Sequence, residues 1–233
     1  MIETKMIYKT RKEEIDLCYS ILLDLQLDEQ PRGQTLAIDK IHTERFAPVL
    51  KSNILLMLYN LVEACVTNGF LEIYDCIKNN RIVYNQLVKS IQDIWSNYEI
   101  GKAHKTTANQ ITYERQVQSI ISTVITDGTI ELGKEALSIS GNLDARAIRK
   151  LLRDHDIRIA DQSDKLHMLT MKKKRNALAH GEESFGNCAR EITISQLGEI
   201  KDEVLSFILD VLNCLSEYYE QQLFRKTSSS IPP

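Results

Sequence analysis

The chain has 233 residues, 43% of them hydrophobic, which is enough for one large domain or two small ones with a sizeable core. Only nine Gly and four Pro are present, fewer than a many-stranded β protein needs at its turns, so a mainly helical fold is expected. The net charge of −3 excludes a protein that binds nucleic acid through its overall charge. Any such binding must come from a local patch.

The five cysteines show no spacing typical of metal ligands, so they are expected to be reduced core residues, and neither a metal nor a cofactor is predicted. Residues 1–11 are polar and charged with no apolar signal segment, which favours a cytoplasmic location. The most apolar stretch, residues 54–66, contains Asn60 and Glu63 and is shorter than the roughly 20 residues of a membrane span. It predicts a buried helix and no membrane association.

In the first half of the chain, apolar residues recur at steps of three and four. This pattern predicts helices over residues 10–28, 35–46, 48–78 and 83–98. The polar residues 97–110 are expected to form a loop. Over residues 128–140 apolar and polar residues alternate, which indicates a small hairpin or an extended segment.

In the second half, a turn and N-cap at Gly141-Asn142 are expected to begin a short helix. Ser163 or Asp164 can cap the next helix, which is expected to run to about His180. Gly181 then stands at the position that favours a left-handed backbone after a helix.

The last predicted helix spans residues 195–224 and is entered through a Thr193-x-x-Gln196 capping box. Together these elements predict an all-α bundle of long antiparallel helices with a small, partly non-helical insertion. The expected organisation is a helical extension over residues 1–46, a helical domain over 47–224 with the insertion at 97–141, and a disordered tail over 225–233.

The segment with the clearest chemical potential is Arg175-Asn176-Ala177-Leu178-Ala179-His180. Cleaving a phosphodiester without a metal requires a base, an acid and positive charge near the phosphorane oxygens. An imidazole exchanges protons near neutral pH, and a guanidinium offers a fork of donors to phosphate. Arg175 and His180 are therefore candidate catalytic residues.

The spacing of these two residues bears on how they could act together. On an ideal helix Arg175 and His180 lie roughly 140° apart, whereas Asn176 and His180 share a face. A composite site across the two-fold axis of a homodimer would bring the arginine and the histidine together. In the alternative interpretation, a histidine followed by Gly181 is simply an ordinary helix end.

Lysines and arginines are concentrated around this motif. Residues 145–180 contain ten Lys or Arg against four Asp, and the run Lys172, Lys173 and Lys174 is a candidate RNA-binding surface. The same run could equally be a solvated helix face. The histidines outside the motif, His42, His104, His155 and His167, share no metal-like spacing and are expected at the surface or at helix caps.

A second polar pattern lies in the central apolar helix, where Asn53, Asn60, Glu63 and Thr67 fall within roughly 80° of arc. Such a stripe either faces water or meets polar partners inside the bundle. Glu63 is a natural partner for Arg175 or for a nitrogen of His180.

These residues resemble the HEPN superfamily, and most closely its MAE-type HEPN-like nucleases of bacterial toxin and defence systems. The resemblance rests on Asn60 and Glu63, on Ser140-Gly141-Asn142-Leu143-Asp144, and on Arg175 to Gly181. It implies a HEPN-like bundle that commonly dimerises and cleaves RNA without a metal. It also implies Arg175 as the phosphate-binding residue, His180 as the acid and base, Asn176 as an orienting residue, and Asn60 and Glu63 as supporting residues.

One position departs from a related group. HEPN toxins paired with nucleotidyltransferase antitoxins carry a tyrosine two residues after the motif histidine, where this chain has Glu182. Silencing by modification of that tyrosine is therefore not expected.

The leading hypothesis is an endoribonuclease that acts as a toxin or abortive-defence effector, works as a homodimer and meets an antitoxin or defence-system partner protein. A non-catalytic HEPN-like module that binds nucleotide, RNA or a partner is the alternative, and a structural subunit of a defence assembly is a third possibility. Because attack by the 2′-hydroxyl requires that oxygen, the leading hypothesis predicts RNA over DNA as substrate.

Overall fold

The computed structural model describes residues 1–27, 40–105, 110–137, 139 and 141–226. These residues form eight α-helices, two short 3-10 helices and no β-strand, which confirms the predicted all-α class. The helices are α1 (Ile2–Leu27), α2 (Lys40–Asn79), η1 (Tyr84–Gln86), α3 (Lys89–Lys105), α4 (Gln110–Ile125), η2 (Lys134–Leu137), α5 (Ala145–Asp154), α6 (Leu166–Ala179), α7 (Phe185–Cys188) and α8 (Ile194–Glu220).

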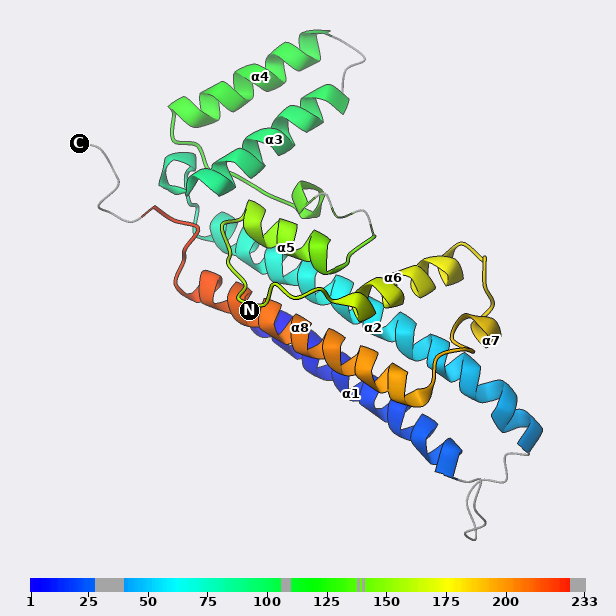
Figure 1. Cartoon of the computed structure of the whole chain (residues 1–233). Helices are drawn as coiled ribbons and strands as arrows, with labels where there is room; N and C mark the ends of the chain where they lie inside the picture. Colours follow the sequence, from blue (N-terminus) through cyan, green and yellow to red (C-terminus); the bar gives the residue numbers. More distant parts are fainter. Residues whose placement is uncertain (28–39, 106–109, 138, 140, 227–233) are drawn as a thin grey trace.

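Helix α2 is the centre of the bundle and packs against α1, α6, α7 and α8 (Figure 1). The part of it from Glu44–Asn79 is long and apolar enough to cross a membrane, so the apolar stretch is longer than expected. However, 61% of its most apolar window is buried by the other helices, and Leu58, Leu61 and Val62 are completely buried. Its apolar character therefore serves the core, as the sequence predicts.

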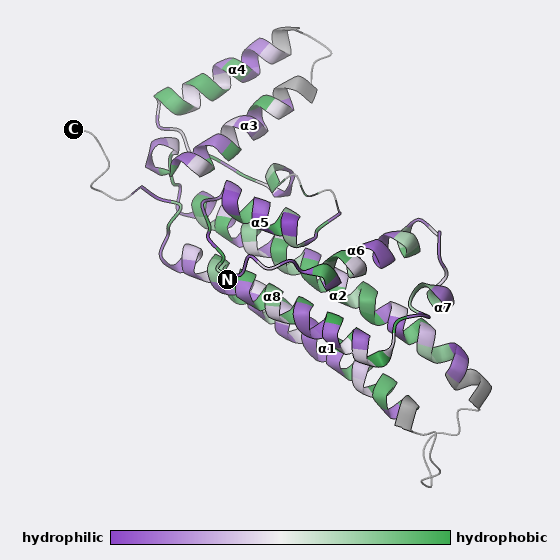
Figure 2. Cartoon of the chain, in the orientation of Figure 1, coloured by the Kyte–Doolittle hydropathy of each residue, from purple (hydrophilic) through white to green (hydrophobic). Residues whose placement is uncertain are grey.

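Helix α8 runs along α1 and α2 and buries one continuous stripe (Figure 2). The predicted capping box is present: Thr193 Oγ1 accepts from the Gln196 N–H at 3.1 Å, and Gln196 Oε1 accepts from the Thr193 N–H at 2.9 Å. The residues at helical spacing along this stripe are all buried, namely Leu197, Ile200, Val204, Ile208, Val211, Leu215 and Tyr218.

Two helix boundaries at the start of the chain differ from expectation. Helix α1 begins at Ile2 rather than near residue 10, because the Met1 amino group and Thr4 bind the Glu72 carboxylate of α2. The helices expected on either side of Pro48 form one helix, α2, with the proline inside it. The break expected between the helices over 10–28 and 35–46 lies outside the described residues.

The middle of the chain also differs. Helix α3 begins at Lys89 rather than residue 83, and it continues to Lys105 through much of the expected loop. It pairs with α4, and the two helices lie beyond one end of the long helices (Figure 1). Of the hairpin or extended segment expected at 128–140, the residues described there form no hairpin: residues 128–133 are non-helical, with one isolated bridge from Thr129 to Val83, and η2 follows.

The N-caps of α5 and α6 are not those predicted. Asp144, not Asn142, caps α5 by accepting from the Ala147 N–H at 2.9 Å. At the start of α6 the cap comes from another helix, because Glu203 of α8 accepts from the backbone N–H groups of His167 and Met168 at 3.1 and 3.4 Å.

The end of α6 is as predicted. Gly181 has a left-handed backbone, with φ of +71°. Its N–H binds the Leu178 carbonyl, and the Glu182 N–H binds the Ala177 carbonyl at 2.9 Å. This pair of bonds is the Schellman arrangement that ends many helices at glycine.

His155 lies at a helix cap, one of the two places expected for it, and not at the surface. It follows α5 as its C-cap and is only 1% exposed, with its ring nitrogens bonded to the Tyr74 hydroxyl and the Leu151 carbonyl, each at 2.7 Å. Burial lowers the pKa of His155 to about 4, so the ring is neutral in the folded protein at neutral pH.

Candidate active site at the α2/α6 contact

Arg175 points from α6 onto α2. Its guanidinium carbon lies 4.2 Å from the centre of the Tyr59 ring, and its Nη2 lies 3.8 Å from Glu63 Oε2. Its Nη1 donates a hydrogen bond of 2.9 Å to Asn176 Oδ1. An arginine has five N–H donors, and in Arg175 one of them donates to an acceptor in the described part of the chain. The side chain is thus held in place with donors left for an anion.

Tyr59 connects this arginine to the segment before α5. The ring is completely buried, and its hydroxyl donates to the Gly141 carbonyl and accepts from the Leu143 N–H at 3.2 Å. Burial raises the pKa of the Tyr59 phenol, which keeps the proton that this donation needs. Gly141 has φ of +70°, and a side chain added there would lie 3.8 Å from Arg175 Nη2.

Asn176 connects Arg175 to the segment before α5. Its Oδ1 accepts from Arg175, and its Nδ2 donates to Asn142 Oδ1 at 2.8 Å. It lies one turn before His180, whose backbone N–H binds the Asn176 carbonyl at 2.9 Å. The polar residue between the two motif positions therefore contacts both Arg175 and the segment around Gly141.

Asp144 holds the same segment from its other end. Besides capping α5, its carboxylate forms an ion pair with Lys172 of α6 at 2.8 Å. Burial alone would raise the pKa of Asp144, but the hydrogen bonds from Lys172 and from the Ala147 N–H outweigh it and lower the pKa. The Asp144 carboxylate is therefore ionised at neutral pH, and Lys172 is engaged in a structural contact.

His180 lies at a different place from Arg175. It is the exposed C-cap of α6, and the structure gives its ring no partner among the residues described. Arg175 faces α2 while His180 faces solvent, as their spacing of five residues implies. Within one chain the structure does not bring the two side chains together.

The three predicted RNA-binding lysines differ in whether they pair with a carboxylate. Lys172 is paired with Asp144, and Lys174 lies 3.2 Å from Glu183. Lys173 is exposed and has no carboxylate partner within the described ranges. It lies seven residues before His180, so the two share a face of α6.

Other Lys and Arg side chains of residues 145–180 also form contacts within the protein. Lys150 and Lys165 pair with aspartates of the same segment, and Arg149 is 8% exposed, bonded to the carbonyls of Asp161 and Ser163. Most of the positive charge of residues 145–180 therefore stabilises the fold.

The polar stripe of α2 has a mixed environment. Glu63 meets Arg175, one of the two partners expected for it. Asn60 is exposed, Glu63 is partly exposed and Thr67 is buried, and all three line a groove between α1 and α2. Asn53, also on this stripe, bonds back to the Val49 carbonyl of its own helix at 2.9 Å.

Sequence reasoning gave no part in the candidate site to Tyr59, Asn142 or Asp144. Tyr59 stands in an apolar run and looks like any core residue, and its partners are 82 and 84 positions away. Asn142 and Asp144 belong to the segment 140–144 noted for its resemblance, and that resemblance was the one available signal. Over the described part of the chain, no three His, Cys, Asp or Glu side chains gather closely enough to hold a metal ion.

Comparison with protein families matches residues 8–224 to the MAE_28990-like HEPN family. The chain belongs to this family. The match covers most of α1, the whole of 97–141 and all of the site residues above, and it confirms the resemblance to MAE-type HEPN domains. Comparison with curated proteins and with solved structures found no match. HEPN membership associates the chain with nuclease-like or RNA-related function.

Proposed function

We propose that this HEPN protein is a metal-independent endoribonuclease that cleaves RNA through attack of the 2′-hydroxyl. The observation that supports this most is the arginine of the motif, held by Tyr59, Glu63 and Asn176 with most of its donors unused. A guanidinium fixed in this way can bind the bridging phosphate and stabilise charge on the phosphorane. His180, exposed at the end of the same helix, would move the protons.

In the proposed reaction, neutral His180 takes the proton of the 2′-hydroxyl, whose oxygen attacks the adjacent phosphorus. The bond to the 5′-oxygen of the next nucleotide breaks, and that oxygen receives a proton from an imidazolium. The products are a 2′,3′-cyclic phosphate and a 5′-hydroxyl end. Arg175 would compensate the charge on the non-bridging oxygens throughout.

The separation of Arg175 from His180 makes a homodimer part of the proposal. The face of α6 that carries His180 also carries Lys173 and the exposed Leu169, so it offers a second chain both apolar and basic groups. A partner chain placed there could bring its arginine toward this histidine. Toxin or abortive-defence action in the cytoplasm, with an antitoxin or a defence-system partner, belongs to the same proposal.

The test is incubation of purified protein with mixed RNA in the presence of EDTA. The unaltered chain should cleave the RNA, while Arg175→Ala and His180→Ala should fold normally and not cleave it. RNA with hydrogen in place of the 2′-hydroxyl at the cut site should resist. Efficient cleavage of that RNA would exclude the mechanism.

A binding module without catalysis is the second candidate. The paired lysines are compatible with it, and so is the exposed His180, whose ring has no partner among the described residues. Such a module predicts that RNA is bound in a salt-dependent manner and recovered intact, and that expression of the chain is harmless to cells.

A further inference from the structure

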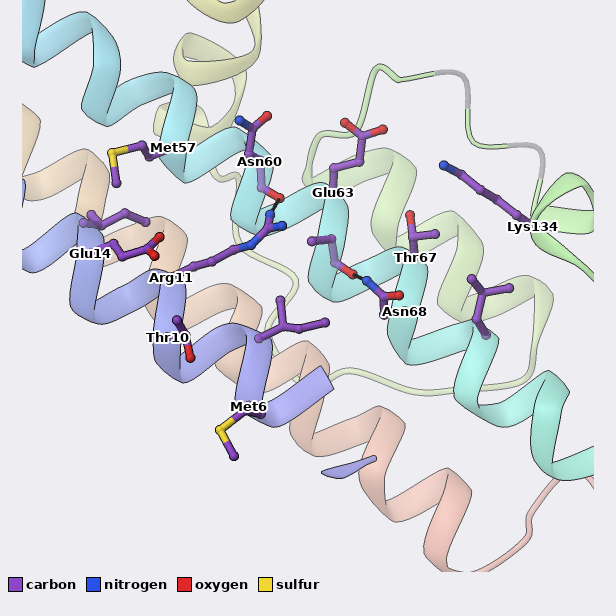
Figure 3. A pocket seen from close by; sticks show the side chains of 14 residues that line it. Met6, Thr10, Arg11, Glu14, Met57, Asn60, Glu63, Thr67, Asn68 and Lys134 are labelled. Carbon is purple, nitrogen blue, oxygen red and sulfur yellow. Dashed lines mark hydrogen bonds between the residues drawn. The ribbon is translucent and has the colours of Figure 1, made fainter. Parts of the chain in front are cut away.

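A groove of about 850 Å³ lies between α1 and α2 on the side of Glu63 (Figure 3). Met6 and Arg11 line it from α1, and Met57, Asn60 and Thr67 line it from α2. Pockets of this volume are typical of sites that enclose a small organic molecule or one unit of a polymer. Met57 lies near one end of the groove and Met6 lies toward the other, with polar side chains between them (Figure 3).

The polar side chains of the groove include groups that the protein leaves without partners. Thr67 is only 7% exposed, and its hydroxyl has no hydrogen-bond partner within the described structure. The side-chain amide of Asn60, which points toward the opening in Figure 3, likewise has no partner among the described residues. Since a buried hydroxyl without a partner costs free energy, a ligand that displaces the atoms covering Thr67 Oγ1 would gain a hydrogen bond there.

Cations lie at two places along the groove. Arg11 extends from α1 across it, and its Nη1 donates a hydrogen bond of 2.6 Å to the Asn60 carbonyl. Lys134 of η2 points toward the groove from one end, and no carboxylate in the described ranges pairs with it (Figure 3). These positions suit the phosphates of a strand that passes along the groove.

The groove and the candidate active site share a residue. Glu63 lines the groove and also pairs with Arg175 at 3.8 Å, so a phosphate on Arg175 would lie next to the groove opening. We propose that the α1/α2 groove binds a nucleotide of single-stranded RNA adjacent to the phosphate held by Arg175. This inference rests on the proposed ribonuclease function and names the part of the substrate that the groove takes.

The chemistry of the walls fits an unstacked base. Met57, one helical turn before Asn60, and the aliphatic side chains beside it can cover the face of the base. Asn60 or Thr67, which lie two helical turns apart on α2, can exchange hydrogen bonds with its edge, as side chains do with splayed bases in single strands. Arg11 contacts the backbone of the strand.

Binding and cleavage are measured separately to test this. Affinity is measured by fluorescence anisotropy with a short labelled RNA whose 2′-hydroxyls are methylated, so that it cannot be cut. Thr67→Val, which removes one hydroxyl and keeps the shape, should weaken binding by about threefold to tenfold, the effect of one hydrogen bond. Arg11→Ala should weaken it and reduce the slope of log affinity against log salt by about 0.7, the value for one phosphate contact with a single strand.

Lys9→Ala is the matched control, because Lys9 is an exposed cation of α1 outside the groove. It should bind RNA like the unaltered chain. Thr67→Val should melt no lower than the unaltered chain, because the hydroxyl it loses has no partner in the described structure. Weaker RNA binding by a variant that folds normally then supports RNA binding in the groove.

The outcomes separate the two proposals. If RNA is cleaved normally and both groove variants bind and cleave like the unaltered chain, the groove inference is overturned and the ribonuclease stands. If the groove variants weaken binding but no RNA is ever cleaved, the groove is supported and the ribonuclease falls. An altered oligomeric state in Arg11→Ala, with unchanged RNA affinity, would assign the groove to a second copy and overturn the inference.

Discussion

Tyr59→Phe tests whether a buried hydroxyl organises the site. The substitution keeps the ring beneath Arg175 and removes only the oxygen that bridges Gly141 and Leu143. It leaves a backbone carbonyl and a backbone N–H without their partner at a buried position. Since each such loss costs about 1 to 2 kcal/mol, the free energy of unfolding should fall by about 2 to 4 kcal/mol.

The same change should also affect the site. The freed segment carries Asn142, which supports Asn176 and through it Arg175, so RNA cleavage should fall by about tenfold, equivalent to about 1.4 kcal/mol. Stability is measured by urea unfolding, and cleavage is measured under conditions where the variant remains folded.

Tyr218→Phe supplies the matched control for this substitution. Tyr218 is 2% exposed, and its hydroxyl has no hydrogen-bond partner within the described part of the chain. The control should therefore be as stable as the unaltered protein or slightly more stable. If Tyr59→Phe and the control unfold at the same urea concentration, the hydroxyl does not hold the segment and the reasoning is wrong.

Four further outcomes are expected. Mixing Arg175→Ala with His180→Ala chains should restore about a quarter of the cleavage if each site combines residues of two chains, and none if it does not. Glu63→Gln should strengthen RNA binding severalfold in anisotropy measurements, because it removes the carboxylate that competes with phosphate for Arg175. The pKa of His155 is about 4 in the folded protein against an ordinary 6.5, so the neutral ring contributes about 3 kcal/mol to the free energy of unfolding above pH 6.5, and this contribution is lost toward pH 4. The free energy of unfolding of His155→Gln, measured in urea, should therefore depend less on pH between 6.5 and 4 than that of the unaltered chain. Gly181→Ala should lower the free energy of unfolding by about 1 kcal/mol, since φ there is +71° and an added side chain meets no neighbour.

Features that depend on neighbouring residues could be predicted from the sequence. The capping box of α8 lies within four residues, and the glycine stop of α6 acts within one turn. The pairing of Glu63 with Arg175 was also foreseeable, because a carboxylate on a mostly apolar helix requires a cation from another element.

Apart from the pairing of Glu63 with Arg175, the features that depend on distant partners could not be predicted in this way. Helix α6 begins where Glu203 of α8 supplies the cap, and α1 begins where Glu72 of α2 binds Met1. No local pattern identifies either carboxylate as a cap. Tyr59 is the same case within the site, because its role follows from where the Gly141 segment passes, which only the folded chain establishes.

The charges around Arg175 suggest how an acidic protein can bind RNA at one place. Arg175, Lys172 and Lys174 each face a carboxylate, so these three side chains present little unpaired positive charge. These pairs are partly exposed, and such pairs contribute at most about 1 kcal/mol each. A phosphate can therefore displace Glu63 from Arg175 at small cost, whereas nucleic acid that does not reach the guanidinium meets a nearly neutral surface. Binding at this site then depends on the fit of the strand to Arg175 and its surroundings rather than on the net charge of −3.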